Sequence, residues 1–196
     1  MEKINFIKTF IPQGDFREKY EHGGMMVRHL AAVLDEKMGA YECYECTVPI
    51  GEYDEGEIQK AFVEFSAKMD ALKLKQAKAD KIAEISDYDT SSSVNGFMLN
   101  GLLVWLDKAT RVGLMNSTTI AKAAGQQTTT LWLGGIKLVV DCDKAIQLLS
   151  ALEMYALECF NVTAAHKKAV SELDNIEAVL TYDYKSGYPD KLNMEV

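Results

Sequence analysis

Two glycine-containing turns, each between apolar runs, constrain the fold of this chain more than any other sequence feature. Asn100-Gly101 lies within "FMLNGLLVWL", and Gly134-Gly135 lies within "TTTLWLGGIKLVV". Both pairs tolerate positive φ at the two central turn positions, so each predicts a two-residue β-hairpin. A helical pattern follows each hairpin. The sequence therefore predicts a hairpin-plus-helix unit that is built twice.

Aspartates at the start of each helical pattern predict where the helices begin. Asp107 is placed to cap a helix that Gly125 closes, and Asp141 or Asp143 is placed to cap the long helix that follows the second hairpin. The glycine turns align at an offset of 34 residues, whereas the Asp-Lys-Ala stretches that begin at Asp107 and Asp143 align at an offset of 36. The difference predicts a two-residue insertion between strand and helix in the second copy.

The number of copies limits the architecture. Two copies are too few for a free-standing solenoid, so we expect a pseudo-symmetric pair packed face to face. Trp105 and Trp132 fall within the two hairpins. We expect both rings in the core between sheet and helix, where a large ring fills space well. An exposed tryptophan would instead favour a contact surface.

The N-terminal third follows different patterns. "INFIKTFIP" and "YECYECTVPI" alternate like strands, and "GGMMVRHLAAVLDEKMGA" indicates a short helix closed by Gly39. From residue 55 to 87, apolar residues including Ile58, Phe62 and Met69 recur at spacings of three and four. This pattern is typical of a helix that connects two cores, or alternatively of a short coiled coil.

The predicted fold class is α+β. It comprises a small N-terminal α+β lobe over residues 1–54, a long connecting helix over residues 55–87, and a C-terminal domain over residues 88–196 with two β-hairpin-plus-helix units.

Composition excludes several classes of function. The formal net charge is −8 and the basic stretches are interrupted by acidic residues, so nucleic acid and anionic membranes are not expected partners. No apolar run is long enough to span a bilayer, and the start of the chain lacks a secretion signal. We expect synthesis in the cytoplasm.

No catalytic residue, cofactor site or metal site is expected. Cys43 and Cys46 form the pair "CYEC", but no matching second ligand pair follows, and an alternating strand would place the two thiols on opposite faces. A zinc or redox role for this pair remains a third alternative. His22, His29 and His166 are expected at the surface or at the edge of the core.

Polar and aromatic residues near two turns indicate a possible interaction surface. "YDYKSGYPDKL" presents Tyr182, Tyr184 and Tyr188 around a glycine and a proline, and "GQQTTT" presents Gln126 and Gln127. Tyrosine supplies contact area and a hydroxyl at low entropic cost. The alternative is that the tyrosines belong to a packed C-terminal tail.

The C-terminal part resembles a known family. "VNGF" with the Asn-Gly hairpin, "WLDKATRVGL", "TTTLW", "LLSALEMYALECFNVTAAHKKAV" and "YDYKSGYP" resemble a C-terminal domain of unknown function found in tailed-phage and prophage proteins, over roughly residues 88–192. Its members are commonly encoded beside tail-fibre and baseplate genes, and it also looks distantly like the tail-fibre assembly proteins. The N-terminal half lies outside this resemblance.

The resemblance implies a non-enzymatic tail or baseplate protein, an adaptor between tail or tail-fibre components. The expected location is the tail region of the virion, after synthesis in the host bacterial cytoplasm. The expected partners are other tail, baseplate or tail-fibre proteins and, in the assembled particle, further copies of this chain. The alternative is a tail-fibre assembly chaperone that is absent from the mature particle.

Overall fold

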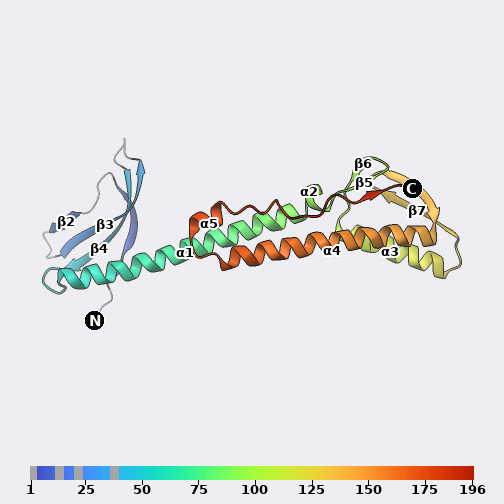
Figure 1. Cartoon of the computed structure of the whole chain (residues 1–196). Helices are drawn as coiled ribbons and strands as arrows, with labels where there is room; N and C mark the ends of the chain where they lie inside the picture. The colour runs from blue at the N-terminus through green and yellow to red at the C-terminus, as the bar shows by residue number, and fades with distance from the viewer. Residues whose placement is uncertain (1–3, 12–15, 20–23, 36–39) are drawn as a thin grey trace. The chain divides into compact units, whose positions relative to one another are not determined.

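The computed structural model of the 196-residue chain describes residues 4–11, 16–19, 24–35 and 40–196. The chain divides into two compact units, residues 1–73 (unit 1) and residues 74–196 (unit 2), and each contains helix and sheet (Figure 1). The α+β fold class is therefore confirmed. Helix α1 (Glu55–Asp89) contributes its first part to unit 1 and its last part to unit 2. None of the helices in the described ranges is both long and apolar enough to cross a membrane.

Unit 1 is an antiparallel sheet packed on the first part of α1. Its strand order is β1-β4-β3-β2, and the strands are β1 (Ile7–Ile11), β2 (Phe16–Lys19), β3 (Gly24–Asp35) and β4 (Ala40–Pro49). The two strands expected from alternation are thus confirmed. Tyr44 and Phe6 pack their rings against Phe62 and Phe65 of the helix. These rings and Ile58 are packed together and form the apolar core of the unit.

The expected helix in "GGMMVRHLAAVLDEKMGA" is wrong. Residues Gly24–Asp35 form strand β3, which pairs with β2 on one side and with β4 on the other. A short apolar run cannot be assigned by periodicity alone. Here the two neighbouring strands supply hydrogen-bond partners on both edges, and this tertiary pairing overrides the local helical pattern. Gly39, the expected helix end, and His22 lie outside the described residues.

Unit 2 contains the two predicted hairpin-plus-helix copies in sequence. The first consists of β5 (Phe97–Leu99), β6 (Leu102–Val104) and α3 (Lys108–Ala123), and the second of β7 (Thr128–Leu133), β8 (Ile136–Asp141) and α4 (Cys142–Glu172). Both turn pairs have positive φ, with 48° and 80° at Asn100-Gly101 and 57° and 87° at Gly134-Gly135. Both predicted hairpins are therefore confirmed, with the primed turn geometry that suits twisted strands.

The capping aspartates correct the expected alignment of the two copies. Asp107 accepts a hydrogen bond from the Thr110 amide, as expected. In the second copy the cap is Asp141, which accepts from the amides of Asp143 and Lys144, and Asp143 is already inside the helix. Each cap follows its second turn glycine by six positions, so no residue is inserted at the second strand-to-helix junction. The Asp-Lys-Ala stretches that begin at Asp107 and Asp143 therefore occupy different positions in the two copies.

The two hairpins share one core. Leu99 and Val104 of the first copy cluster with Leu131 and Val140 of the second and with the inner face of α4. The second turn lies directly on the first copy, because a Cβ added at Gly134 would come within 2.9 Å of Val104 Cγ1. Close approach and positive φ therefore both favour glycine at this position.

The tryptophans lie outside this core, contrary to expectation. Trp105 is 40% exposed and Trp132 is 58% exposed. Trp132 alternates with the buried Leu131 and Leu133 along β7, so the pleat directs its ring to the outer face. Smaller branched side chains occupy the inner positions instead.

The remaining elements of unit 2 pack in two places. The end of α1 and the short helix α5 (Ile176–Leu180) lie against the second half of α4, where they share a cluster centred on Ile85, Val170 and Val179. Helix α2 (Ser92–Asn95), which follows α1, and strand β9 (Asn193–Met194), which adds to β5 in parallel, join the core of the hairpins. The chain beyond α5 thus returns along α4 to the small sheets (Figure 1).

The capping assignment leads to a test with paired variants. Asp141→Ala should destabilise the protein by about 1 kcal/mol, because two amides of the first turn lose their acceptor. Asp143→Ala should cost less than half as much, since its ion pair with Lys122 is exposed on both sides. Urea denaturation measures both. A larger loss for Asp143→Ala would show that the cap is misassigned.

A buried carboxylate links three elements of unit 1. Glu42 on β4 is 7% exposed, and its side chain lies 2.8 Å from Lys8 Nζ of β1 and 3.1 Å from Lys73 Nζ of α1. The hydrogen bond from Lys8, aided by the one from Lys73, lowers the pKa of Glu42 below its usual value, although burial acts in the opposite direction. Contact with Glu42 correspondingly raises the pKa of Lys73.

This lowered pKa gives a pH prediction. Since the folded pKa of Glu42 lies below the unfolded value, its ion pairs stabilise unit 1 fully above about pH 4.5, and the contribution is lost as pH falls through the folded pKa. Glu42→Gln should therefore lower stability at neutral pH by about 1–2 kcal/mol. The difference from wild type should vanish in acid. Thermal denaturation across pH measures this, with the exposed Glu52→Gln as control.

Candidate binding groove

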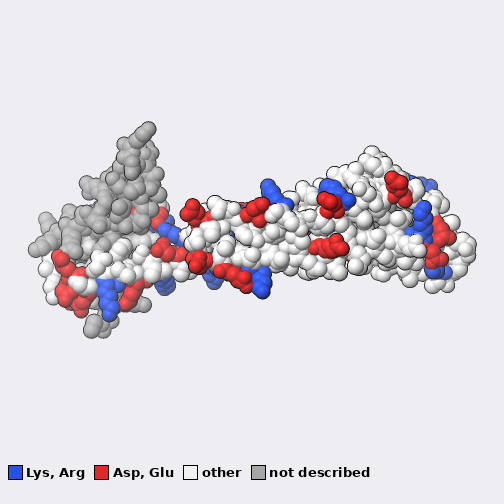
Figure 2. All heavy atoms as spheres, in the orientation of Figure 1, with Lys and Arg blue, Asp and Glu red and all other residues white. Residues whose placement is uncertain are grey.

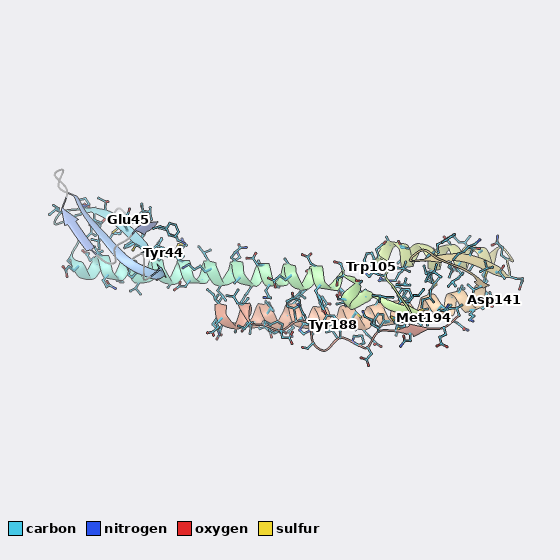
Figure 3. All side chains as sticks on the ribbon, turned by 90° about the horizontal axis from the view of Figure 1, so that it is seen from above. Tyr44, Glu45, Trp105, Asp141, Tyr188 and Met194 are labelled. Carbon is cyan, nitrogen blue, oxygen red and sulfur yellow. The ribbon has the colours of Figure 1, made fainter. Side chains whose placement is uncertain are left out.

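A groove in unit 2 lies where three helices approach one another. It has a volume of about 680 Å³ and is lined by the last residue of α1, the start of α3 and two turns of α4. The segment that joins β6 to α3 forms one side, and Figure 3 labels Trp105 there, between the end of α1 and the start of α3. This volume falls within the range of small-ligand sites.

One part of the groove is apolar and aromatic. Trp105, Leu157 and Phe160 line it with exposed fractions of 40%, 50% and 59%. Leu157 and Phe160 are three residues apart on α4 and lie on the same side of the helix, next to the buried Ala156. Large apolar side chains that remain exposed around a hollow are typical of a binding site rather than of a folded core.

A buried arginine forms the polar part of the groove. Arg111 lies on the face of α3 that packs against α4, and its side chain is only 9% exposed. Its Nε donates to Glu153 Oε1 at 2.9 Å, and its Nη1 donates to the carbonyl oxygen of Leu106 at 2.8 Å. A guanidinium has five N–H donors. The other three have no hydrogen-bond partner in the part of the chain that the structure describes.

The carboxylates of the groove are engaged in structural contacts. Asp107 accepts from the Thr110 hydroxyl and amide with its two oxygens, and these hydrogen bonds lower its pKa. Asp89 accepts from the Thr163 hydroxyl at 2.7 Å. Glu153 pairs with Arg111 and is partly exposed to water. At the rim, Lys108 is exposed and has no ion-pair partner among the described residues.

The three tyrosines of the predicted interaction surface are packed onto unit 2. Tyr182 hydrogen-bonds His166 Nδ1 at 2.9 Å, and the hydroxyl of Tyr188 lies 2.9 Å from that of Thr163. Tyr184 and Tyr188 both contact the ring of Tyr88 edge-on, and burial raises the pKa of Tyr188. All three are half-buried, so each retains some exposed surface.

The structure does not bring the two glutamines to these tyrosines. Gln126 and Gln127 are exposed between α3 and β7, where the carbonyl oxygen of Gln127 accepts from the amide of Cys142 at the start of α4. Tyr182 contacts His166, which lies about 36 Å further along the same helix at 1.5 Å per residue. Whether either set contacts a partner stays a prediction.

The cysteine pair lies on β4 as expected. Cys46 belongs to the core against α1, and the strand's alternation places Cys43 on the opposite face. Both cysteines are buried, and burial raises the pKa of the Cys46 thiol, which favours its protonated form at neutral pH. Within the described ranges, no three His, Cys, Asp or Glu side chains are grouped so that they could hold a metal ion.

These features define an α+β protein of two units whose larger unit carries a mainly apolar groove with a buried guanidinium. Residues 76–186 match the family model described as "Domain of unknown function (DUF4376)". Because this match covers more than half of the chain, the protein belongs to the DUF4376 family. The match confirms the expected C-terminal domain of unknown function. No curated protein and no solved structure matches the chain.

The groove has almost no signature in the sequence. Arg111 stands on the same helical face as Leu114, Met115 and Thr118, where a charge is unusual, and this was the one available signal. Its partners are Leu106, five positions earlier, and Glu153 on another helix. Only the packing of α3 on α4 brings the pair together.

The Arg111–Glu153 pair can be tested by stability. Glu153→Ala should destabilise the protein by about 1–2 kcal/mol, because a largely buried guanidinium loses its counter-charge, although the exposure of Glu153 reduces the effect. Glu158→Ala is the matched control, an exposed glutamate on the same helix. It should cost less than about 0.5 kcal/mol. Equal losses in urea denaturation would contradict the importance of the pair.

Proposed function

We propose that this protein is a non-enzymatic adaptor of a phage tail or baseplate that connects tail or tail-fibre components in the virion. Its partners are other tail, baseplate or tail-fibre proteins, and several copies assemble in the particle. The similarity of the C-terminal part to domains encoded beside tail-fibre and baseplate genes supports this proposal. Two units with separate cores give one chain two sets of surfaces, which suits a connector.

The outer face of the β7–β8 hairpin is the observation that carries the proposal. Trp132 and Val139 are 58% and 67% exposed, and the pairing of Thr130 with Val139 and of Trp132 with Lys137 makes them diagonal neighbours. Large parts of the visible surface of unit 2 are uncharged (Figure 2). Exposed apolar neighbours on a sheet are typical of protein contact sites.

The edges of the same hairpin favour a protein partner as well. β7 and β8 form a two-stranded sheet, so neither pairs with a further strand in the described part of the chain. An unpaired edge offers backbone donors and acceptors to a strand of another protein. The hairpin therefore combines an apolar face with available main-chain hydrogen bonds.

A tail-fibre assembly chaperone is the alternative function. Such a protein would use the same exposed hairpin to bind a fibre during folding and would then dissociate. An adaptor requires stoichiometric presence in mature particles, whereas a chaperone requires absence. This difference separates the two functions.

Quantitative mass spectrometry of purified particles tests the proposal. For a phage or prophage that encodes this chain, the adaptor function predicts the chain at a fixed ratio to the other tail proteins. Its absence from particles that contain all other tail proteins would refute the adaptor function and favour the chaperone.

A pair of variants then tests the hairpin. Trp132→Ser with Val139→Ser should leave folding intact, because both side chains are exposed, and should reduce incorporation into particles by about tenfold or more. Ile120→Ser on α3, which is 69% exposed, is the matched control. Normal incorporation of the double variant would show that the hairpin face is not the contact.

A further inference from the structure

We propose that the groove between α1, α3 and α4 is a binding site for a carboxylate carried on an aromatic or aliphatic body. Arg111 receives the carboxylate, and Trp105, Leu157 and Phe160 contact the apolar body. This inference rests on the groove alone and does not depend on the proposed role in a phage tail.

The unpartnered donors of Arg111 identify the head group. Its side chain is 9% exposed and lines the groove, and its contacts with Glu153 and Leu106 use only two of five N–H donors. Arg111 Nη2 is not one of the fully buried side-chain atoms that lack a partner among the described residues, so it reaches the water of the groove, which a ligand acceptor can replace. A carboxylate offers two acceptor oxygens in the geometry that matches a guanidinium.

Unused hydrogen-bond donors, rather than net charge, favour an anionic ligand, because the lining holds three carboxylates and two cationic side chains. Both oxygens of Asp107 are occupied by Thr110, Asp89 is held by Thr163, and Glu153 is held by Arg111. The cationic side chains retain unused donors, since Lys108 at the rim has N–H groups to offer, like Arg111, and has no ion-pair partner among the described residues. A ligand carboxylate would therefore meet donors that no protein group has satisfied.

The apolar lining identifies the rest of the ligand. Trp105 and Phe160 offer ring surface, and Leu157 continues the apolar wall along α4. The volume of about 680 Å³ admits a body of one ring with a short chain and leaves space for more. Burial of such a body supplies the favourable free energy, and the carboxylate sets the orientation.

The test compares three probes with one body and different heads. 4-Phenylbutyrate, 4-phenylbutanol and 4-phenylbutylamine are titrated into the full-length ¹⁵N-labelled protein. The chain has two tryptophans, so its spectrum has two indole N–H signals, which Trp105→Phe assigns. The acid should shift the Trp105 signal with a Kd of ~1 mM and leave the Trp132 signal unchanged. The alcohol should bind about tenfold more weakly, and the amine more weakly still.

Two variants separate the head from the body. Phe160→Ala should weaken the acid and the alcohol to the same extent, with Leu180→Ala, exposed on α5, as the matched control. Arg111→Met should abolish the preference for the acid. If Arg111→Met does not fold, the head-group series on the wild type together with Phe160→Ala decides the question.

A peptide arm distinguishes two sources of the same chemistry. N-acetyl-Ala-Ala-Phe with a free terminal carboxylate is compared with its amide. A preference for the peptide acid over 4-phenylbutyrate would indicate the chain end of a protein, and the reverse would indicate a free small acid. Either preference supports the proposal. Equal binding of acid and alcohol, or no shift of the Trp105 signal with either acid at about 10 mM, would overturn it.

Discussion

Unit 2 depends on the buried face of α4. Along this one helix, Leu149, Leu152 and Cys159 complete the core of the hairpins, and Val170 completes the cluster with α1 and α5. Within the hairpin core, the hydroxyl of Tyr155 donates to the carbonyl oxygen of Val94 at 2.7 Å. Burial raises the pKa of this hydroxyl, so it remains a donor at all physiological pH values. Without α4 each two- or three-stranded sheet would be only marginally stable.

The groove follows from the same helix. One side of α4 is buried against α1 and α3. Its adjacent side, with Leu157 and Phe160, lies between the end of α1 and the start of α3. Arg111 extends from α3 to Glu153 across this contact. The buried charge is thus held by helix packing, and its unused donors face a hollow that the fold itself creates. This arrangement is the basis of the carboxylate site that we propose.

The two units use buried charge in different ways. In unit 1, Glu42 is satisfied by two lysines, which join β1, β4 and α1. In unit 2, Arg111 keeps three donors without a partner among the described residues. Removing one partner of the Glu42 group would leave a buried charge uncompensated, whereas the spare donors of Arg111 face a groove and can contact a ligand. The exposed Trp132 and Val139 form a second candidate contact surface, and this one is apolar.

Elements whose signals are local could be predicted from the sequence. Asn-Gly and Gly-Gly turns require positive φ, aspartates cap adjacent amides, and α1 shows its own apolar period, so both hairpins and helices α1, α3 and α4 could be predicted. Features that depend on distant parts of the chain could not be predicted in this way. Strand β3 is extended because β2 and β4 pair with it, and Trp105 lines a groove because α1, α3 and α4 meet beside it. Local sequence cannot encode these outcomes, since each is set by residues from separate parts of the chain.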